Sequence, residues 1–159
     1  MPIAWEPRLD TGIEVIDEQH KRIVNYINQL EAARRSGDRN QVMAVIEELV
    51  DYTQSHFGFE EAMMEEAGYE FLKPHQKVHE LFIKRVTEFT MRAAKGEDIA
   101  EELQHTLTRW LMNHIANEDH NYAEAVKRMV ARKQQAAVTT PAAATSKGLF
   151  ASLLKRFFR

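Results

Sequence analysis

The chain has no cysteine among its 159 residues. Thiolate-bound zinc sites and iron–sulfur clusters are therefore excluded, because both need cysteine sulfur. The sequence also lacks a run of about 18 apolar residues, the length expected of a membrane-spanning helix. Residues 1–6 have neither the basic region nor the apolar region of a signal peptide. These absences predict a cytoplasmic protein without a membrane span.

Alternation of apolar and polar residues, the pattern of β-strands, is also missing from the sequence. Apolar residues instead recur at spacings of three and four, which is typical of amphipathic helices. The pattern predicts four long helices, over about 13–36, 40–66, 73–95 and 98–133, after an N-terminal arm that contains Trp5. Long helices joined by short loops pack most simply as an up-down-up-down bundle. We therefore predict an all-α four-helix bundle over residues 1–133.

Polar residues occur on each apolar stripe where a hydrophobic residue would be expected. They are five histidines and one glutamate, namely His20, His56, Glu60, His75, His79 and His114, and Asp119 follows His114 by five residues on the fourth predicted helix. A spacing of four, as between His75 and His79, places both side chains on one helix face. Buried without an ion, these groups would leave many polar atoms without partners, at about 1–3 kcal/mol each. Imidazoles bind metals such as iron and zinc, and carboxylates bridge two ions, so seven donors predict a dinuclear metal centre.

Other polar residues have simpler interpretations. His105 and His120 lie off the stripes and are predicted to be surface residues. A solvated acidic face is predicted for Glu61, Glu65, Glu66 and Glu118. No phosphate-binding loop or catalytic triad is visible, and the acidic body of the chain argues against binding to nucleic acid.

With this set of residues the chain resembles the hemerythrin family, in its bacterial single-domain form, over residues 1 to about 130. The resemblance rests on Trp5, Asp17-Glu18-Gln19-His20, His56-Phe57-x-x-Glu60-Glu61, His75-x-x-x-His79 and His114-x-x-x-x-Asp119. Every ligand position of the family is filled, so the match is specific.

The resemblance implies two iron ions, in the Fe2+ or Fe3+ state, with a bridging oxo or hydroxo group. Glu60 and Asp119 would bridge the two irons. One iron would take three histidines, which are His75, His79 and His114. The other would take only His20 and His56, which leaves it one ligand short and open to O2.

In the family, O2 binds reversibly at the iron with fewer ligands. Trp110 and Leu111 match apolar positions beside this O2 pocket, and a dry pocket favours reversible binding over turnover. The resemblance thus implies that the protein stores or delivers oxygen and is not an enzyme. Two alternatives stay open: a di-iron oxidase, peroxidase or nitric-oxide-reducing enzyme, and a sensor of O2 or redox state.

The fourth helix contains one irregular spacing. Asp119 follows His114 by five residues, which is about 140° around an ideal helix, whereas Glu118 at four residues is nearer the same face. The resemblance selects Asp119 as the ligand. We therefore expect a local widening of the helix, or a long reach of the side chain, at this point.

The charge of the chain is divided unevenly. The whole chain carries −3, yet eight of its 21 basic residues and none of its 24 acidic residues follow Glu124. The first 124 residues therefore hold 24 acidic and 13 basic residues, a net charge of −11. Such asymmetry indicates that the body and the tail are different functional units.

The tail is predicted to have two parts. Residues 134–146 contain mainly small and polar residues typical of a flexible linker. Residues 147–159 are predicted to form a cationic amphipathic helix, whose apolar residues are Leu149, Phe150, Leu153, Leu154, Phe157 and Phe158. An isolated helix of this length is marginal in water, so we expect it to be unfolded until it meets an interface. That interface would be the inner face of a membrane or a groove on a partner protein, and otherwise the tail would be a spacer.

Overall fold

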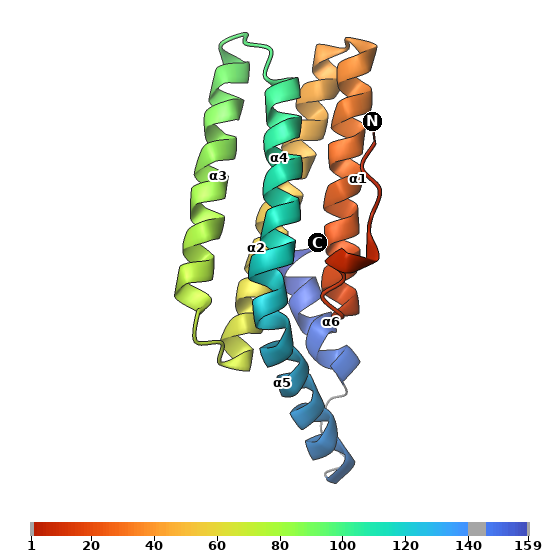
Figure 1. Ribbon diagram of the computed structural model, residues 1–159, viewed down its shortest axis with the longest axis vertical. Coiled ribbons are helices and arrows are strands. Elements are labelled where there is room, and N and C mark those ends of the chain that lie inside the picture. Colours follow the sequence, from red (N-terminus) through yellow and green to blue (C-terminus); the bar gives the residue numbers. More distant parts are fainter. Residues whose placement is uncertain (1, 140–145, 159) are drawn as a thin grey trace.

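The computed structural model of the protein describes residues 2–139 and 146–158 (Figure 1). Its elements in chain order are η1 (Pro7–Leu9), α1 (Glu14–Ser36), α2 (Arg39–Ala67), α3 (Leu72–Ala94), α4 (Ala100–His114), η2 (Ile115–Asp119), α5 (His120–Thr139) and α6 (Ser146–Phe157). None of the described residues belongs to a β-strand. The all-α fold predicted from the helical periodicity is confirmed.

Four long rods form the bundle, because α4, η2 and α5 follow one another without a break and act as the fourth rod (Figure 1). Helix α1 packs against α2 and α4, and α2 also packs against α3 and α5. The turn between α1 and α2 is short because Gly37 adopts a left-handed conformation, with φ of 72°, at the end of α1. The Asp38 carboxylate then accepts hydrogen bonds from the backbone N–H groups of Asn40 and Gln41 at 2.9 and 3.1 Å. This N-cap starts α2 at once and reverses the chain.

Two apolar clusters fill the bundle interior. On α1, Ile23 belongs to the first cluster and Ile16 to the second, and the two are 3% and 0% exposed. Burial of one such side chain stabilises the fold by about 1.5–3 kcal/mol. His20 lies between these two residues on the same face of α1, so the polar centre is enclosed by apolar core on both sides along the bundle axis.

The fourth rod is irregular where the sequence predicted it. Residues Ile115–Asp119 form a π-helix between α4 and α5. In a π-helix the hydrogen bond runs to the fifth residue, so one extra residue is accommodated in the turn. Asp119 is fully buried as a result, whereas Glu118 is partly exposed. The expected widening of the helix is confirmed.

Helix α6 departs from the expectation of an unfolded tail. It is helical from Ser146 to Phe157 and lies against α2 and α5 at one end of the bundle (Figure 1). The ring of Phe158 lies 5.1 Å from that of Tyr52 and 6.1 Å from that of Phe59. The bundle itself thus supplies the interface that a short amphipathic helix needs, because apolar side chains of α2 are available there.

Part of the segment that was predicted to be a linker is helical. Helix α5 extends to Thr139, so residues 134–139 continue the helix. Glutamine and alanine, which make up most of this stretch, are good helix formers. Residues 140–145 of the expected linker, and the side chains of Lys147, Leu149 and Arg159 in the tail, lie outside the described residues.

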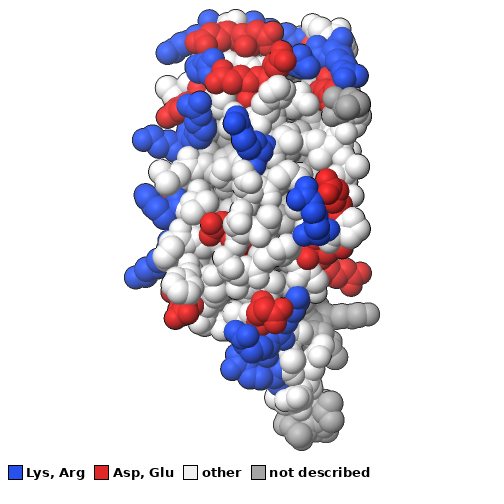
Figure 2. All heavy atoms as spheres, in the orientation of Figure 1, with Lys and Arg blue, Asp and Glu red and all other residues white. Residues whose placement is uncertain are grey.

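The surface carries charges of both signs. Figure 2 shows acidic and basic side chains gathered at the end of the bundle where the α1–α2 and α3–α4 loops lie. Ion pairs occur there between Arg34 and Glu101 at 3.3 Å and between Arg92 and Glu102 at 2.9 Å. Exposed pairs of this kind stabilise a fold by only about 0–1 kcal/mol. Within the described residues, no helix is long and apolar enough to cross a membrane.

Candidate metal centre

The seven residues predicted as metal ligands meet in the middle of the bundle. They come from every rod: His20 from α1, His56 and Glu60 from α2, His75 and His79 from α3, His114 from α4 and Asp119 from η2. None of them is more than 3% exposed. Residues up to 99 positions apart in the sequence are therefore brought together by the packing of the helices.

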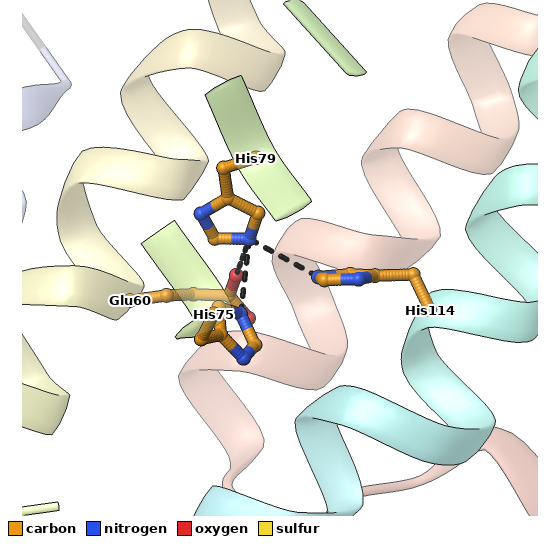
Figure 3. A group of neighbouring side chains, drawn as sticks. All are labelled: Glu60, His75, His79 and His114. Carbon is orange, nitrogen blue, oxygen red and sulfur yellow. Dashed lines mark hydrogen bonds and ion pairs between the residues drawn. The ribbon is translucent and has the colours of Figure 1, made fainter. Parts of the chain in front are cut away.

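Three histidines face one another on one side of the centre. The Nε2 atom of His79 lies 3.0 Å from Nε2 of His75 and 3.1 Å from Nε2 of His114 (Figure 3). Carboxylate oxygens lie close to the same atoms: Asp119 Oδ1 is 3.1 Å from His114 Nε2, and Glu60 Oε2 is 3.5 Å from His79 Nε2. Three ring nitrogens and two carboxylates therefore converge on a common region. We call His75, His79 and His114 the three-histidine group.

The other side of the centre contains two histidines. The His20 Nε2 atom lies 3.1 Å from Asp119 Oδ2 and 3.7 Å from Glu60 Oε1. The His56 Nε2 atom lies 3.5 Å from Glu60 Oε2. Each carboxylate thus lies within 4 Å of histidines from both sides. This is the arrangement required of a ligand that bridges two ions. We call His20 and His56 the two-histidine group.

The donor atoms fit metal ions better than they fit one another. Within the described part of the chain, both nitrogens of His20, both oxygens of Asp119 and Glu60 Oε2 are buried without a hydrogen bond. Such groups are normally paired in a protein interior. Two sets of residues each offer donor atoms that all lie within 4.8 Å of one another. One set is Glu60, His75, His79 and His114, and the other is His20, His56 and Glu60. Nitrogen and oxygen donors without sulfur suit iron, zinc, copper or nickel.

The protonation states of the metal-free centre also suit metal binding. Burial lowers the pKa of His56 to about 3 and that of His75 to about 4, so both rings are neutral at pH 7. Burial alone would lower the pKa of His20, but the adjacent Asp119 and Glu60 carboxylates raise it to about 9. Burial alone would raise the pKa of Asp119, but the adjacent His114 and His20 rings hold it well below its usual range. Neutral imidazoles and ionised carboxylates are the forms that bind metals, so His20 must lose its proton before it can bind an ion.

Comparison with known proteins agrees with this geometry. The family model of the hemerythrin HHE cation binding domain matches residues 11–126. The chain belongs to the hemerythrin family. A bacteriohemerythrin of Stenotrophomonas maltophilia is 48% identical over 159 residues, an alignment that covers 98% of this chain and 97% of that protein.

Other members of the hemerythrin family match the body of the chain without its tail. A bacteriohemerythrin of Pseudomonas aeruginosa is 54% identical over 125 residues, which covers 79% of this chain and 82% of that protein. Hemerythrin subunit alpha of Lingula anatina is 31% identical over 121 residues, covering 76% and 92%. A crystal structure of wild-type hemerythrin has the same fold, with a TM-score of 0.75, 24% identity, and coverage of 79% of this chain and 98% of that chain.

Residues around this hemerythrin-type centre orient its histidines. The Nδ1 atom of His56 lies 2.7 Å from Oε1 of Gln19, and Nδ1 of His79 lies 2.8 Å from Oε1 of Glu61. A ring that donates through Nδ1 directs the lone pair of Nε2 at the centre. Gln76 donates to the second oxygen of Glu61 at 3.1 Å and fixes that carboxylate in turn.

The role of Glu61 corrects one expectation. Glu61 was predicted to belong to a solvated acidic face, but its side chain is only 26% exposed and lies against His79. The prediction holds for Glu65 and Glu66, which are exposed. Helical spacing gave no signal for Glu61, because its partner comes from another helix.

Tyr122 is a further residue of the site that sequence reasoning did not single out. Its hydroxyl donates to Oε1 of Glu60 at 2.5 Å, and the residue is fully buried. Burial and the nearby Glu60 and Asp119 carboxylates raise the pKa of Tyr122 well above its usual value. The tyrosine therefore stays a hydrogen-bond donor and holds one oxygen of the carboxylate between the two groups. Its position three residues after Asp119, on the same helix face, was the available signal.

Aromatic rings enclose the histidines. The Phe57 ring stacks on His79 at 3.7 Å, and Trp110 stacks on His114 at 4.3 Å. Trp110 and Leu111, the predicted O2-pocket residues, line a small, mostly apolar cavity together with six others: Ile23, Ile27, Thr53, Phe57, Phe82 and Leu107. The volume of this cavity is about 10 Å³. Trp5 of the N-terminal arm stacks over His20 at 6.1 Å and covers the centre from that side.

The two remaining histidines take no part in the centre. His105 is exposed, as predicted. His120 is partly buried, and its Nε2 atom lies 3.1 Å from the backbone oxygen of Asp10. His120 therefore attaches the N-terminal arm to the start of α5.

Proposed function

We propose that the protein binds O2 reversibly at a non-haem di-iron centre and thereby stores or delivers oxygen. The observation that carries this proposal is the unequal division of the histidines. Both carboxylates lie within reach of both groups, but one group has three histidines and the other has two. An ion in the two-histidine group would keep an open position for a small ligand.

The assignment of residues follows from this division. One iron would be held by the three-histidine group and the other by the two-histidine group. Glu60 and Asp119 would bridge them, with an oxo or hydroxo group as a further bridge. When bound, the iron pair supplies the two electrons that reversible O2 binding requires.

The protein residues around the irons would set the geometry and exclude water. Gln19 and Glu61 hold the rings of His56 and His79, and Tyr122 holds Glu60. The stacked rings of Phe57 and Trp110 cover the three-histidine group. A closed apolar surround slows proton entry and keeps side reactions rare. These features support a carrier, and the cavity of about 10 Å³ beside the centre has no room for an organic substrate.

The test is to reconstitute the metal-free protein with ferrous iron under anaerobic conditions, measure iron per chain, and record optical spectra with and without O2. We expect two irons per chain and an O2-dependent absorption that disappears when O2 is removed. Stopped-flow mixing with O2 separates a carrier from an oxidase, because a carrier keeps its oxygenated form for much longer than a catalytic turnover. One metal per chain, or immediate oxidation without a reversible phase, would contradict the proposal.

The tail would add a second, conditional interaction. Binding of residues 147–159 to a membrane surface or a partner protein requires a free apolar face, whereas Leu153, Leu154 and Phe157 are partly buried against the bundle. We propose that the docked position is the resting state and that anionic membranes compete for the same face. In the cytoplasm, the protein would then bind to the inner face of a membrane only when α6 is undocked from the bundle.

A further inference from the structure

Thr53 has a buried hydroxyl next to the proposed O2 site. It lies on α2, three residues before His56, and is 5% exposed. Within the described residues its Oγ1 atom has no hydrogen-bond partner. A hydroxyl in the protein interior is normally paired, because water is no longer available to it. This group therefore calls for a physical explanation.

Other helical threonines of the chain show what is unusual about Thr53. A threonine inside a helix can donate to the backbone oxygen three or four residues earlier. Thr87 donates to Ile83 at 2.9 Å, and Thr108 donates to Gln104 at 2.8 Å. Thr53 makes no such bond to its own helix. Its hydroxyl is thus free to donate to something that is not part of the protein.

The cavity beside the centre is the place where such a partner fits. Thr53 lines this cavity of about 10 Å³ and carries the only hydroxyl among its lining residues. That volume is close to the least that holds one water-sized molecule. Ile23, another lining residue, lies three residues after His20 on α1, just as Thr53 lies three residues before His56 on α2. Two of the lining residues thus lie one helical turn from His20 and His56, which places the cavity about one turn along α1 and α2 from the two-histidine group.

We propose that the Thr53 hydroxyl donates a hydrogen bond to the small ligand that occupies this cavity, and so selects ligands that accept one. The inference rests on the proposed function, under which the ligand is O2. Electron density moves onto O2 when it binds, so a neutral donor at this point stabilises the bound form. Thr53 is then a specificity-determining residue in a pocket whose other lining residues are apolar or aromatic.

The first experiment needs no metal. Thr53→Val removes the hydroxyl and keeps the shape, so the metal-free variant should lose an unpaired buried polar group. We expect its melting temperature to rise by about 2–4 °C. Thr108→Val is the matched control, and its melting temperature should fall or stay unchanged, because that hydroxyl is already paired. A fall in the melting temperature of Thr53→Val would show that the hydroxyl has a partner in the protein, and would overturn the proposal.

The second experiment measures O2 dissociation from the iron-loaded protein by stopped flow. Thr53→Val should release O2 about tenfold faster, while Thr53→Ser, which keeps the hydroxyl, and Thr108→Val should stay near the wild-type rate. Equal rates in all four proteins would overturn the proposal. If the wild type holds two irons but binds no O2, the proposed function fails by itself. Azide affinity of the oxidised protein then decides the role of Thr53: weaker binding in Thr53→Val alone supports it, and equal binding overturns it.

Discussion

His114 and Asp119 are five residues apart in the sequence, yet His114 Nε2 lies 3.1 Å from Asp119 Oδ1. In a regular α-helix the fifth residue is about 140° away around the axis. The π-helix at Ile115–Asp119 removes this offset by holding one extra residue in the turn. Glu118, which an α-helix would have placed closer to His114, remains partly exposed. A local irregularity of the backbone thus decides which acidic residue enters the centre.

Asp119→Asn should lower the iron content below two per chain. The amide is neutral and offers one oxygen in place of two, so it bridges two ions poorly. Glu118→Gln changes the neighbouring acidic residue in the same way and should keep two irons. Iron analysis of the two purified proteins makes the comparison. If Glu118→Gln loses iron and Asp119→Asn keeps it, the assignment of Asp119 is wrong.

His20→Ala and His56→Ala should impair O2 binding more than any other histidine substitution. These residues would hold the iron with the smaller number of ligands. The loss of either one should release that iron, and the open position for O2 is lost with it. His105→Ala should leave the O2-dependent absorption unchanged, because His105 is exposed. Loss of that absorption in His105→Ala would contradict the division of histidines between centre and surface.

Tyr122→Phe should weaken the position of Glu60 without removing a ligand. The variant loses the 2.5 Å hydrogen bond to Glu60 and leaves the carboxylate oxygen Oε1 without its donor. We expect a loss of about 1–3 kcal/mol in the free energy of unfolding of the metal-free protein. With iron bound, the optical spectrum should shift while the iron content stays at two. An unchanged stability and spectrum would mean that the hydroxyl does not act on Glu60.

The stability of the metal-free protein should be greatest near pH 6.5. The adjacent carboxylates raise the pKa of His20 to about 9 against burial, so its contribution is complete below the ordinary value of 6.5 and is lost as pH rises through 9. Burial lowers the pKa of His56 to about 3, so its contribution is complete above 6.5 and is lost as pH falls toward 3. Urea unfolding across pH 4–10 measures both limbs. His20→Gln should flatten the alkaline limb, and an alkaline limb that is unchanged in this variant would exclude His20 as its source.

Gly58→Ala should release α6 from the bundle. A Cβ atom at Gly58 would lie 2.7 Å from the Phe157 ring, so the ring must move away. We expect more of the full chain to co-sediment with phosphatidylglycerol-containing vesicles at low ionic strength, and less at high salt. In a chain that ends at residue 146, the same substitution should stabilise α2 by about 1 kcal/mol, since alanine is the better helix former. The truncated chain should not sediment with the vesicles and should still bind O2.

Co-sedimentation that is equal in the full and truncated chains would exclude the tail as a membrane-binding element. Loss of O2 binding on truncation would show instead that docked α6 supports the centre. If a smaller fraction of the wild type than of Gly58→Ala sediments with the vesicles, docking of α6 competes with membrane binding.

The sequence by itself determined the helices and the buried donors. Ile16, His20 and Ile23 lie three or four residues apart, and this spacing alone places His20 on the buried face of a helix. Such periodic signals are local, because one turn of a helix fixes which residues share a face. The all-α fold and the seven candidate ligands could therefore be predicted, and the irregular spacing at Asp119 even predicted a widened helix.

Only the tertiary structure decided how the helices act on one another. Glu61 meets His79, Gln19 meets His56 and Tyr122 meets Glu60 across helix interfaces, and no spacing within one helix encodes these pairs. The docking of α6 was missed for the same reason. A short amphipathic helix shows in its sequence that it needs an apolar surface, but the surface that it finds is a property of the packed bundle.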